Sequence, residues 1–253
     1  MTSGNGYSLI GGGKFETTSF TLKIIAIVAM TMNHAANIFY NVLPLPALCV
    51  LFGAGGLTFP IMAFLLVVGY RHTSNIKKYA FRLGVFALIS QIPFSLFLAP
   101  TGNVLVTLLI SLGVLYADDQ MRNRAAFWAV FAIAAVGSLA CDWGFLGVVI
   151  VYLFKTMYGQ RGGIAVPVVI AILALGLPLL SNLVANVIAA GDWYYLPQVL
   201  YPFVGCALVI PLLSGYRGRR GYPLKWFFYA YYPAHIAVLG IAYVLAFGAM
   251  PYF

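Results

Sequence analysis

The chain has 253 residues, of which 63% are apolar and only 8% are charged, and its mean hydropathy is +0.97. Soluble domains carry about a quarter charged residues, so this composition excludes a water-soluble enzyme. The net charge of +9 comes from 14 Lys and Arg against 5 Asp and Glu. In so apolar a chain we interpret the basic residues by their distribution among membrane spans, and we expect no nucleic-acid partner.

Apolar segments of about the length that crosses ~30 Å of hydrocarbon recur along the chain. They predict an all-α integral membrane protein, a polytopic bundle of nine transmembrane helices, with eight to ten compatible with the pattern. Residues 1–20 predict a short cytoplasmic tail, and residues 21–253 a single transmembrane domain with an uncleaved first span. In chain order the expected spans are Leu22–Tyr40, Leu57–Tyr70, Tyr79–Leu98, Asn103–Tyr116, Ala125–Leu139, Trp143–Phe154, Gly163–Leu180, Leu196–Leu213 and Trp226–Phe247. The uncharged linker 41–56 is expected to dip into the membrane as a short half-helix.

The charges predict the orientation of these spans. With nine spans, every Lys and Arg falls on one side, and the other side carries only Asp142 and Asp192. The positive-inside rule then places the N-terminus in the cytoplasm and the C-terminus outside.

The basic loops have two interpretations. The first is topogenesis together with attraction to the anionic headgroups of the lipid bilayer, at about 1 kcal/mol per basic residue. The second is that some of these side chains also hold a polyanionic cytosolic ligand, for which Arg71 and Arg82 are best placed, at the ends of two successive spans. The full set of candidates is Arg71, His72, Lys78, Arg82 and Arg219.

Polar side chains inside the spans are costly and commonly mark function. Asn33, His34 and Asn37 share one face of the first span, because positions i, i+3 and i+4 lie on one side of a helix. Tyr232 and His235 share a face of the last span. Ordinary hydrogen bonding between helices is the simpler explanation for Asn37, but two histidines at membrane depth favour a function.

Further polar candidates lie at the ends of other spans. Gln91 is in the third span, Asn103 begins the fourth, and Asp142 precedes the sixth. Cys49 and Cys141 are both expected on the outer side, and a disulfide between them is left open. We expect no metal site, because two histidines without carboxylates in the spans make a poor ligand set.

Several motifs follow one another in a recognisable order. They are Leu22-Lys23-Ile24-Ile25-Ala26-Ile27 leading to Asn33-His34, then Thr58-Phe59-Pro60-Ile61-Met62-Ala63-Phe64, Gly69-Tyr70-Arg71-His72-Thr73-Ser74-Asn75, Phe86-Ala87-Leu88-Ile89-Ser90-Gln91-Ile92-Pro93-Phe94, Asp142-Trp143-Gly144, and Phe227-Phe228-Tyr229-Ala230-Tyr231-Tyr232-Pro233-Ala234-His235. In this order the chain resembles the TraX family, whose namesake acetylates the N-terminus of conjugative pilin. Asn33 stands where the family usually has Asp.

The resemblance implies a multi-pass acetyltransferase of the bacterial cytoplasmic (inner) membrane, with acetyl-CoA as donor and a peptide N-terminus, a glycan or a small molecule as acceptor. We expect His34 to act as general base, oriented by Asn33, and His235 to be a second base or a transient acetyl carrier. Gln91, Asn103, Tyr232 and Asp142 are expected to stabilise an oxyanion or orient the acceptor. The basic candidates are expected to bind the phosphates of acetyl-CoA.

Two other functions fit the same residues. A transporter or channel would line its pathway with these polar groups, although ion coupling normally uses Asp or Glu within the spans. A relative that binds a ligand without catalysis is the other alternative.

Overall fold

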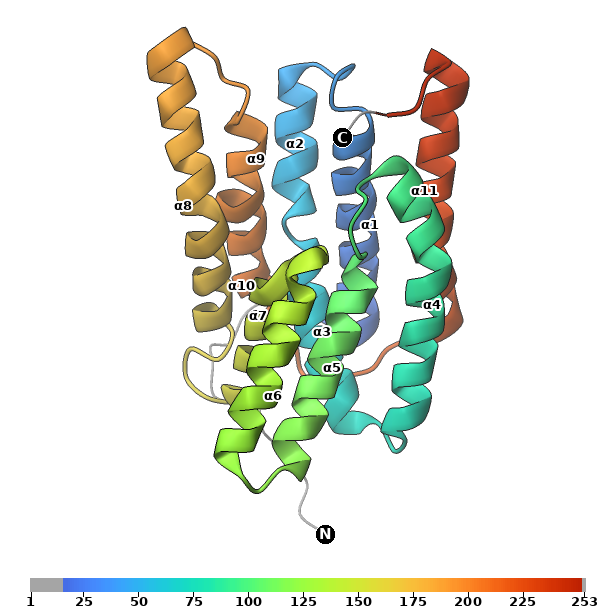
Figure 1. Cartoon of the computed structure of the whole chain (residues 1–253), viewed down its shortest axis with the longest axis vertical. Helices are drawn as coiled ribbons and strands as arrows, with labels where there is room; N and C mark the ends of the chain where they lie inside the picture. The colour runs from blue at the N-terminus through green and yellow to red at the C-terminus, as the bar shows by residue number, and fades with distance from the viewer. Residues whose placement is uncertain (1–15, 252–253) are drawn as a thin grey trace.

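The computed structural model describes residues 16–251, which form a helical bundle with two isolated β-bridges (Figure 1). Most of the expected cytoplasmic tail and the last two residues lie outside this range. The elements are α1 Ser19–Ile38, α2 Leu45–Gly55, α3 Thr58–His72, α4 Ile76–Phe97, α5 Val104–Gln120, α6 Arg124–Gly137, η1 Ser138–Ala140, α7 Gly144–Thr156, α8 Ala165–Ala190, α9 Leu196–Leu200, the π-helical η2 Tyr201–Cys206, α10 Ala207–Ser214 and α11 Lys225–Phe247.

Each of the nine expected spans corresponds to helix, but within residues 16–251 only six helices are long and apolar enough to cross a membrane. These are Ser19–Ile38, Leu45–His72, Ile76–Phe97, Ala165–Ala190, Leu196–Ser214 and Trp226–Phe247. The other three, α5, α6 and α7, have 17, 14 and 13 residues, or about 20 to 26 Å of helix. Figure 1 shows them ending well below the tops of α2, α8 and α11. The structure therefore shows a multi-pass bundle, and the number of crossings stays a prediction.

The second expected span was too short. Leu57–Tyr70 covers most of α3, but α2 and α3 together make one 28-residue span, Leu45–His72, which is broken near Gly56. The break follows from Pro60, which has no N–H to donate to the carbonyl of Gly56 and whose ring clashes with that carbonyl in a regular helix. The Gly56 carbonyl instead accepts the thiol of Cys206 at 3.3 Å. The expected half-helix in the linker is α2.

The seventh expected span was also too short. Gly163–Leu180 is part of α8, which continues through Pro178 to Ala190. Proline is tolerated inside transmembrane helices because neighbouring groups satisfy the freed backbone, so Pro178 does not end the helix.

Other boundaries follow local signals: the side chain of Asn103 caps α5 by accepting the Leu105 N–H at 3.0 Å.

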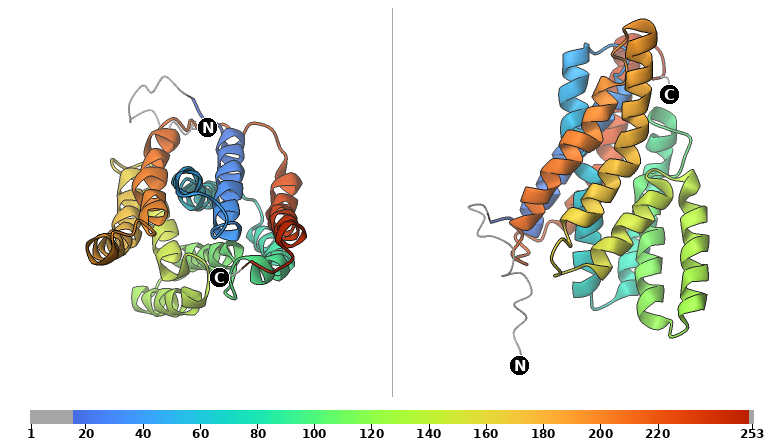
Figure 2. Two further views of the ribbon diagram at one scale, coloured as in Figure 1. Left: turned by 90° about the horizontal axis from the view of Figure 1, so that it is seen from above. Right: turned by 90° about the vertical axis from the view of Figure 1, so that its left-hand side faces the viewer.

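The helices surround α3, the second half of the broken span. In the most apolar part of that span, 67% of the residues are buried inside the protein. Helix α1 packs against α2, α3 and α11, and α4 packs against α11 and α5. The view from above in Figure 2 shows α1 and the broken span inside an arc formed by the other helices. This arrangement places α1, whose C-terminal half carries His34, between the broken span and α11.

Helix ends that carry Lys and Arg gather at one end of the bundle. In Figure 1 the starts of α1, α4, α6 and α11 and the ends of α3, α5, α7 and α10 lie toward the bottom, whereas the loop from α8 to α9 lies at the top. This grouping is the one that the expected topology requires. The side of the membrane on which each end lies remains a prediction.

The broken span contacts η2 through glycines that approach backbone to backbone. A Cβ on Gly205 would collide with the backbone of Gly53 and Gly56, which cannot move aside as a flexible side chain can. We expect Gly205→Ala to lower the free energy of unfolding by about 2 to 3 kcal/mol, the upper range for overpacking. Thermal unfolding in detergent measures the effect.

Gly113→Ala in α5 is the matched control, because a Cβ there meets nothing within 4 Å. Alanine is favoured over glycine in a helix, so this variant should be as stable as the wild type or more so. Equal stability of the two variants would contradict the close approach at Gly205.

Candidate active site

Two histidines from opposite ends of the chain meet inside the bundle. Nδ1 of His34 in α1 lies 2.7 Å from Nε2 of His235 in α11, and the rings are inclined by only 6°. His235 is 6% exposed, and its Nδ1 lies 2.8 Å from the carbonyl oxygen of Tyr231, one turn earlier in α11. The geometry brings together the two residues that the sequence singled out.

These contacts fix the tautomers of the neutral pair. A carbonyl oxygen can only accept a hydrogen bond, so Nδ1 of His235 carries the proton that reaches Tyr231. Nε2 of His235 is then an acceptor, and Nδ1 of His34 must donate to it. The remaining nitrogen, Nε2 of His34, has no proton and no hydrogen-bond partner in the described part of the chain. It has the lone pair that a general base needs.

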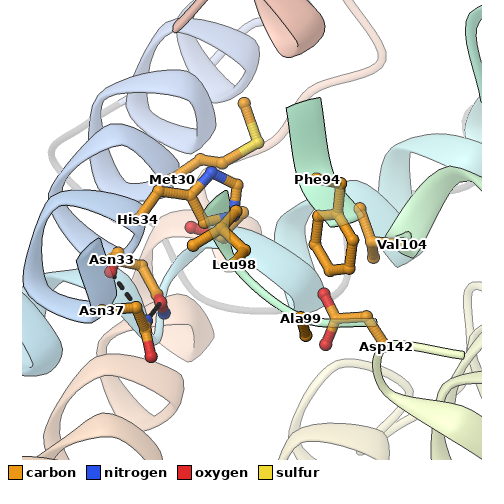
Figure 3. A pocket seen from close by; sticks show the side chains of 10 residues that line it. Met30, Asn33, His34, Asn37, Phe94, Leu98, Ala99, Val104 and Asp142 are labelled. Carbon is orange, nitrogen blue, oxygen red and sulfur yellow. Dashed lines mark hydrogen bonds between the residues drawn. The ribbon is translucent and has the colours of Figure 1, made fainter. Parts of the chain in front are cut away.

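A pocket of about 170 Å³ opens beside His34. Its polar lining includes Asn33, Asn37 and Asp142, and apolar side chains cover much of the remaining wall. Figure 3 shows the α1 residues on one side and Asp142 with Val104 and Phe94 on the other. His34 and Asp142 therefore face one space from opposite walls.

Asp142 reaches the pocket because its loop enters the bundle. The short helix η1 ends at Ala140, and the next residues pair with the chain before α5: Gly102 donates to the Ala140 carbonyl at 2.8 Å, and Asp142 N–H donates to the Gly102 carbonyl at 2.7 Å. Trp143 has φ 64°, a left-handed conformation rare for a side chain of this size, and it stacks on Phe59 with 4.0 Å between ring centres. The packed loop holds a carboxylate opposite His34.

Asn33 does not orient His34 as expected. Its side-chain oxygen accepts from Asn37 Nδ2 at 2.6 Å, and it makes no hydrogen bond to the His34 ring among the described residues. His235 provides the orienting contact instead. Both nitrogens of His235 are engaged in this structure, one with His34 and one with the Tyr231 carbonyl.

Gln91 and Asn103 hold the chain between α4 and α5. Nε2 of Gln91 donates to Ser95 and to the carbonyl of Thr101, both at 2.7 Å. Nδ2 of Asn103 donates to the carbonyl of Ala87 at 2.8 Å and to Gln91 Oε1 at 2.9 Å. Both amide hydrogens of each side chain are thereby used, so these residues position the loop and leave no amide donor for an oxyanion.

Two buried hydroxyls donate to no acceptor within residues 16–251. They are the phenol of Tyr232, which lies edge-on to both histidines, and Oγ1 of Thr58, which lines the pocket at the start of α3. Buried polar groups are almost always hydrogen-bonded, so an unpartnered hydroxyl suggests an absent ligand or water. The sequence predicted a role for Tyr232 but not for Thr58. The signal available for Thr58 was its position two residues before Pro60, directly after the break near Gly56.

The basic candidates do not form one cluster. Arg82 is half-buried between α4 and α11, near Tyr79 and Tyr229, and its Nε has no partner in the described chain. Arg71 is exposed and lies over the ring of Tyr158 at 4.3 Å. The other candidates are also exposed: Lys78, His72 with Nδ1 2.8 Å from the Val68 carbonyl, and Arg219 paired with Glu16 at 3.1 Å.

Comparison with known proteins shows the family of this chain. The family model described as TraX protein matches residues 19–243, a segment that includes every residue of the pocket. The chain belongs to the TraX family. The chain is similar to the probable fimbrial assembly protein FimC, serogroup H1, of Dichelobacter nodosus, with 30% identity over 242 residues that cover 88% of this chain and 95% of the relative. No solved structure matches.

The cysteines and acidic residues add no metal or disulfide centre to the described region. Cys49, Cys141 and Cys206 are all free, so the disulfide that the sequence left open does not form in the structure. Within residues 16–251, no three His, Cys, Asp or Glu side chains come close enough to hold a metal ion. The chemistry that we consider therefore centres on the histidine pair and its pocket.

Proposed function

We propose that this TraX-family protein is a membrane-embedded acetyltransferase that moves an acetyl group from acetyl-CoA to an amine or hydroxyl acceptor. The observation that supports this most strongly is the bare Nε2 of His34, a residue that lines the pocket and whose ring is held by the 2.7 Å contact with His235. A base fixed in one tautomer and shielded from bulk water is suited to deprotonating a nucleophile.

In the proposed reaction, the amine nitrogen or hydroxyl oxygen of the acceptor attacks the thioester carbonyl, and Nε2 of His34 takes the proton that this atom loses. The carbon–sulfur bond then breaks, and the same Nε2–H returns its proton to the departing thiolate. A new carbon–nitrogen or carbon–oxygen bond replaces the thioester, and the histidine ends in its starting state. His235 stabilises the imidazolium that exists between the two transfers, because its Nε2 keeps accepting from His34 Nδ1.

The unpartnered hydroxyls of Tyr232 and Thr58 are the proposed donors to the oxyanion that forms on the carbonyl oxygen. Donors already fixed in place act strongly where water is excluded. Asp142 is proposed to hold the acceptor on the wall opposite His34, and a carboxylate there favours an acceptor that arrives as an ammonium ion. An ammonium loses a further proton before it attacks, and Asp142 is placed to accept it.

Arg82 is the basic residue whose environment best fits a phosphate of acetyl-CoA. The Arg82 side chain lies beside Tyr229 in α11. Tyr229 is six residues before His235, so it lies about 9 Å along the helix from His235, toward the N-terminal end of α11. The buried Nε of Arg82 has no partner among residues 16–251. A guanidinium in this position fits an anionic ligand that enters from the basic end of the bundle and extends toward the histidines.

We expect Arg82→Gln to raise both the Kd and the KM for acetyl-CoA by about 10- to 100-fold, the range for a lost charge-assisted hydrogen bond, with little change in kcat. Isothermal titration with CoA, together with initial rates, measures both constants. Arg122→Gln, in the exposed loop between α5 and α6, removes the same charge and should leave both constants unchanged. Equal effects of the two variants would point to general surface charge and remove this role from Arg82.

The relative from Dichelobacter nodosus supports a place in fimbrial assembly. It is named a probable fimbrial assembly protein and is matched over 95% of its length. We therefore propose the amino-terminal amine of a fimbrial subunit as the first acceptor to test, ahead of glycans and small amines. The proposed location is the bacterial cytoplasmic membrane.

The test is acetyl transfer by the purified full-length protein in detergent, with radiolabelled acetyl-CoA and a synthetic fimbrial-subunit peptide. Transfer of label to the amine, detected by mass spectrometry, is the expected result. Binding of CoA without thioester consumption, with or without an acceptor, would favour a non-catalytic ligand-binding protein. Ion or solute flux through proteoliposomes without acetyl transfer would favour a transporter.

A further inference from the structure

A second hydrogen bond joins α1 and α11 one turn before the histidines. Oγ1 of Thr31 lies 2.7 Å from the hydroxyl of Tyr231, and it also donates to the carbonyl of Ile27 at 2.8 Å. Because a threonine hydroxyl has one hydrogen, Tyr231 must be the donor in the contact between the two helices. Thr31 precedes His34 by three residues and Tyr231 precedes His235 by four, so the two ties lie about one helical turn apart.

Tyr231 contacts His235 in two ways. Its carbonyl oxygen accepts the proton on Nδ1 of His235 at 2.8 Å, and its ring stacks on the imidazole with 5.1 Å between centres and 13° between planes. One residue thus provides both the acceptor that selects the tautomer of His235 and the surface against which its ring lies. The hydroxyl of the same residue is tied to Thr31 on the helix that carries His34.

We propose that Thr31 and Tyr231 are positioning residues for the histidine pair. The Thr31–Tyr231 bond fixes the Tyr231 ring and the register of the two helices. That register keeps His235 in the Nδ1–H tautomer and within hydrogen-bonding distance of His34. Neither hydroxyl touches a substrate in this proposal, and their effect passes through His235 to Nε2 of His34.

The tautomers can be measured without any enzymatic assay. The chain has three histidines, so protein labelled with ¹⁵N-histidine gives few imidazole signals, and those of His72 are identified by their loss in His72→Gln. In the folded wild type, at a pH where the rings are neutral, we expect Nδ1 of both His34 and His235 to show the ¹⁵N shift of a protonated nitrogen. Their Nε2 atoms should show the shift of an unprotonated nitrogen. Thr31→Val and Tyr231→Phe should each give a mixture of tautomers.

The kinetic effect rests on the proposed function. Loss of one positioning hydrogen bond should lower kcat by about 3- to 10-fold, and the KM for acetyl-CoA should not change. Thr31→Ser keeps the hydroxyl, so this variant should have the kcat and the ¹⁵N shifts of the wild type. The double variant Thr31→Val/Tyr231→Phe should be no slower than the slower single variant, because both substitutions break the same bond.

A similar tie at the start of α1 provides the control. Oγ of Ser19 lies 2.9 Å from the hydroxyl of Tyr216, so Ser19→Ala also breaks a hydroxyl–tyrosine bond of α1, far from the histidines. This variant should leave the tautomers and kcat unchanged, even if it lowers the melting temperature.

The outcomes separate this proposal from the proposed function. Unchanged ¹⁵N shifts in both Thr31→Val and Tyr231→Phe would overturn the positioning role, whatever the activity. The same holds if His235 of the wild type is protonated on Nε2. Tautomers that respond as expected in a protein that transfers no acetyl group would sustain the positioning role and reject the acetyltransferase.

Discussion

His34→Ala is expected to lower kcat for acetyl transfer by about 10²- to 10⁴-fold, the contribution of a positioned acid–base group. The substitution removes the bare Nε2 of a residue that lines the pocket. It also leaves Nε2 of His235 without its donor. The Kd for CoA should not change, because the imidazole acts on the acceptor and the phosphates lie elsewhere. Single-turnover rates with saturating acetyl-CoA, and binding measured separately, give the two quantities.

The control for this prediction is His34→Asn. Asparagine keeps a hydrogen-bonding side chain of similar reach but provides no base, so it should be nearly as slow as alanine. Turnover at the wild-type rate in both variants would reject His34 as the base. A matching loss of CoA binding would instead mean that the substitution disturbs the fold of the pocket.

Tyr232→Phe is expected to lower kcat by about 10²- to 10³-fold, as removal of one donor to an oxyanion does in other acyl transfers. The phenol is buried, has no hydrogen-bond partner within residues 16–251, and lies edge-on to both histidines at 6.1 and 5.7 Å between ring centres. Phenylalanine keeps the packing and removes only the hydroxyl. The KM for acetyl-CoA should change little, because the interaction forms mainly in the transition state.

Tyr243→Phe is the matched control in the same helix. Tyr243 is 5% exposed and packs on Phe39, two turns beyond His235. It should retain the wild-type kcat. Similar rates for Tyr232→Phe and the wild type would leave Thr58 as the sole proposed side-chain donor, and a large loss in Tyr243→Phe would attribute the effect to packing in α11.

The sequence by itself determined the class of the protein and the helices that carry the site. Hydropathy and helical periodicity are local properties, so they predicted nine helical segments and placed His34 and His235 on polar faces of the first and last. The side chain of Asn103 signalled the start of α5, because a cap acts within one turn. Local signals placed the break near Gly56, but they did not show that α2 and α3 form one span across it, because the two halves are joined only in the packed bundle.

Only the tertiary structure decided which polar groups meet. The 2.7 Å contact between His34 and His235 joins residues 201 positions apart, and helical periodicity says which face a residue occupies but not which helix lies against it. Packing likewise brought Asp142 opposite His34, used the amides of Gln91 and Asn103 to hold a loop, and left the hydroxyl of Thr58 unpartnered in the pocket. Hydrogen-bond partners depend on distances between separate elements, so they emerge only when the helices pack.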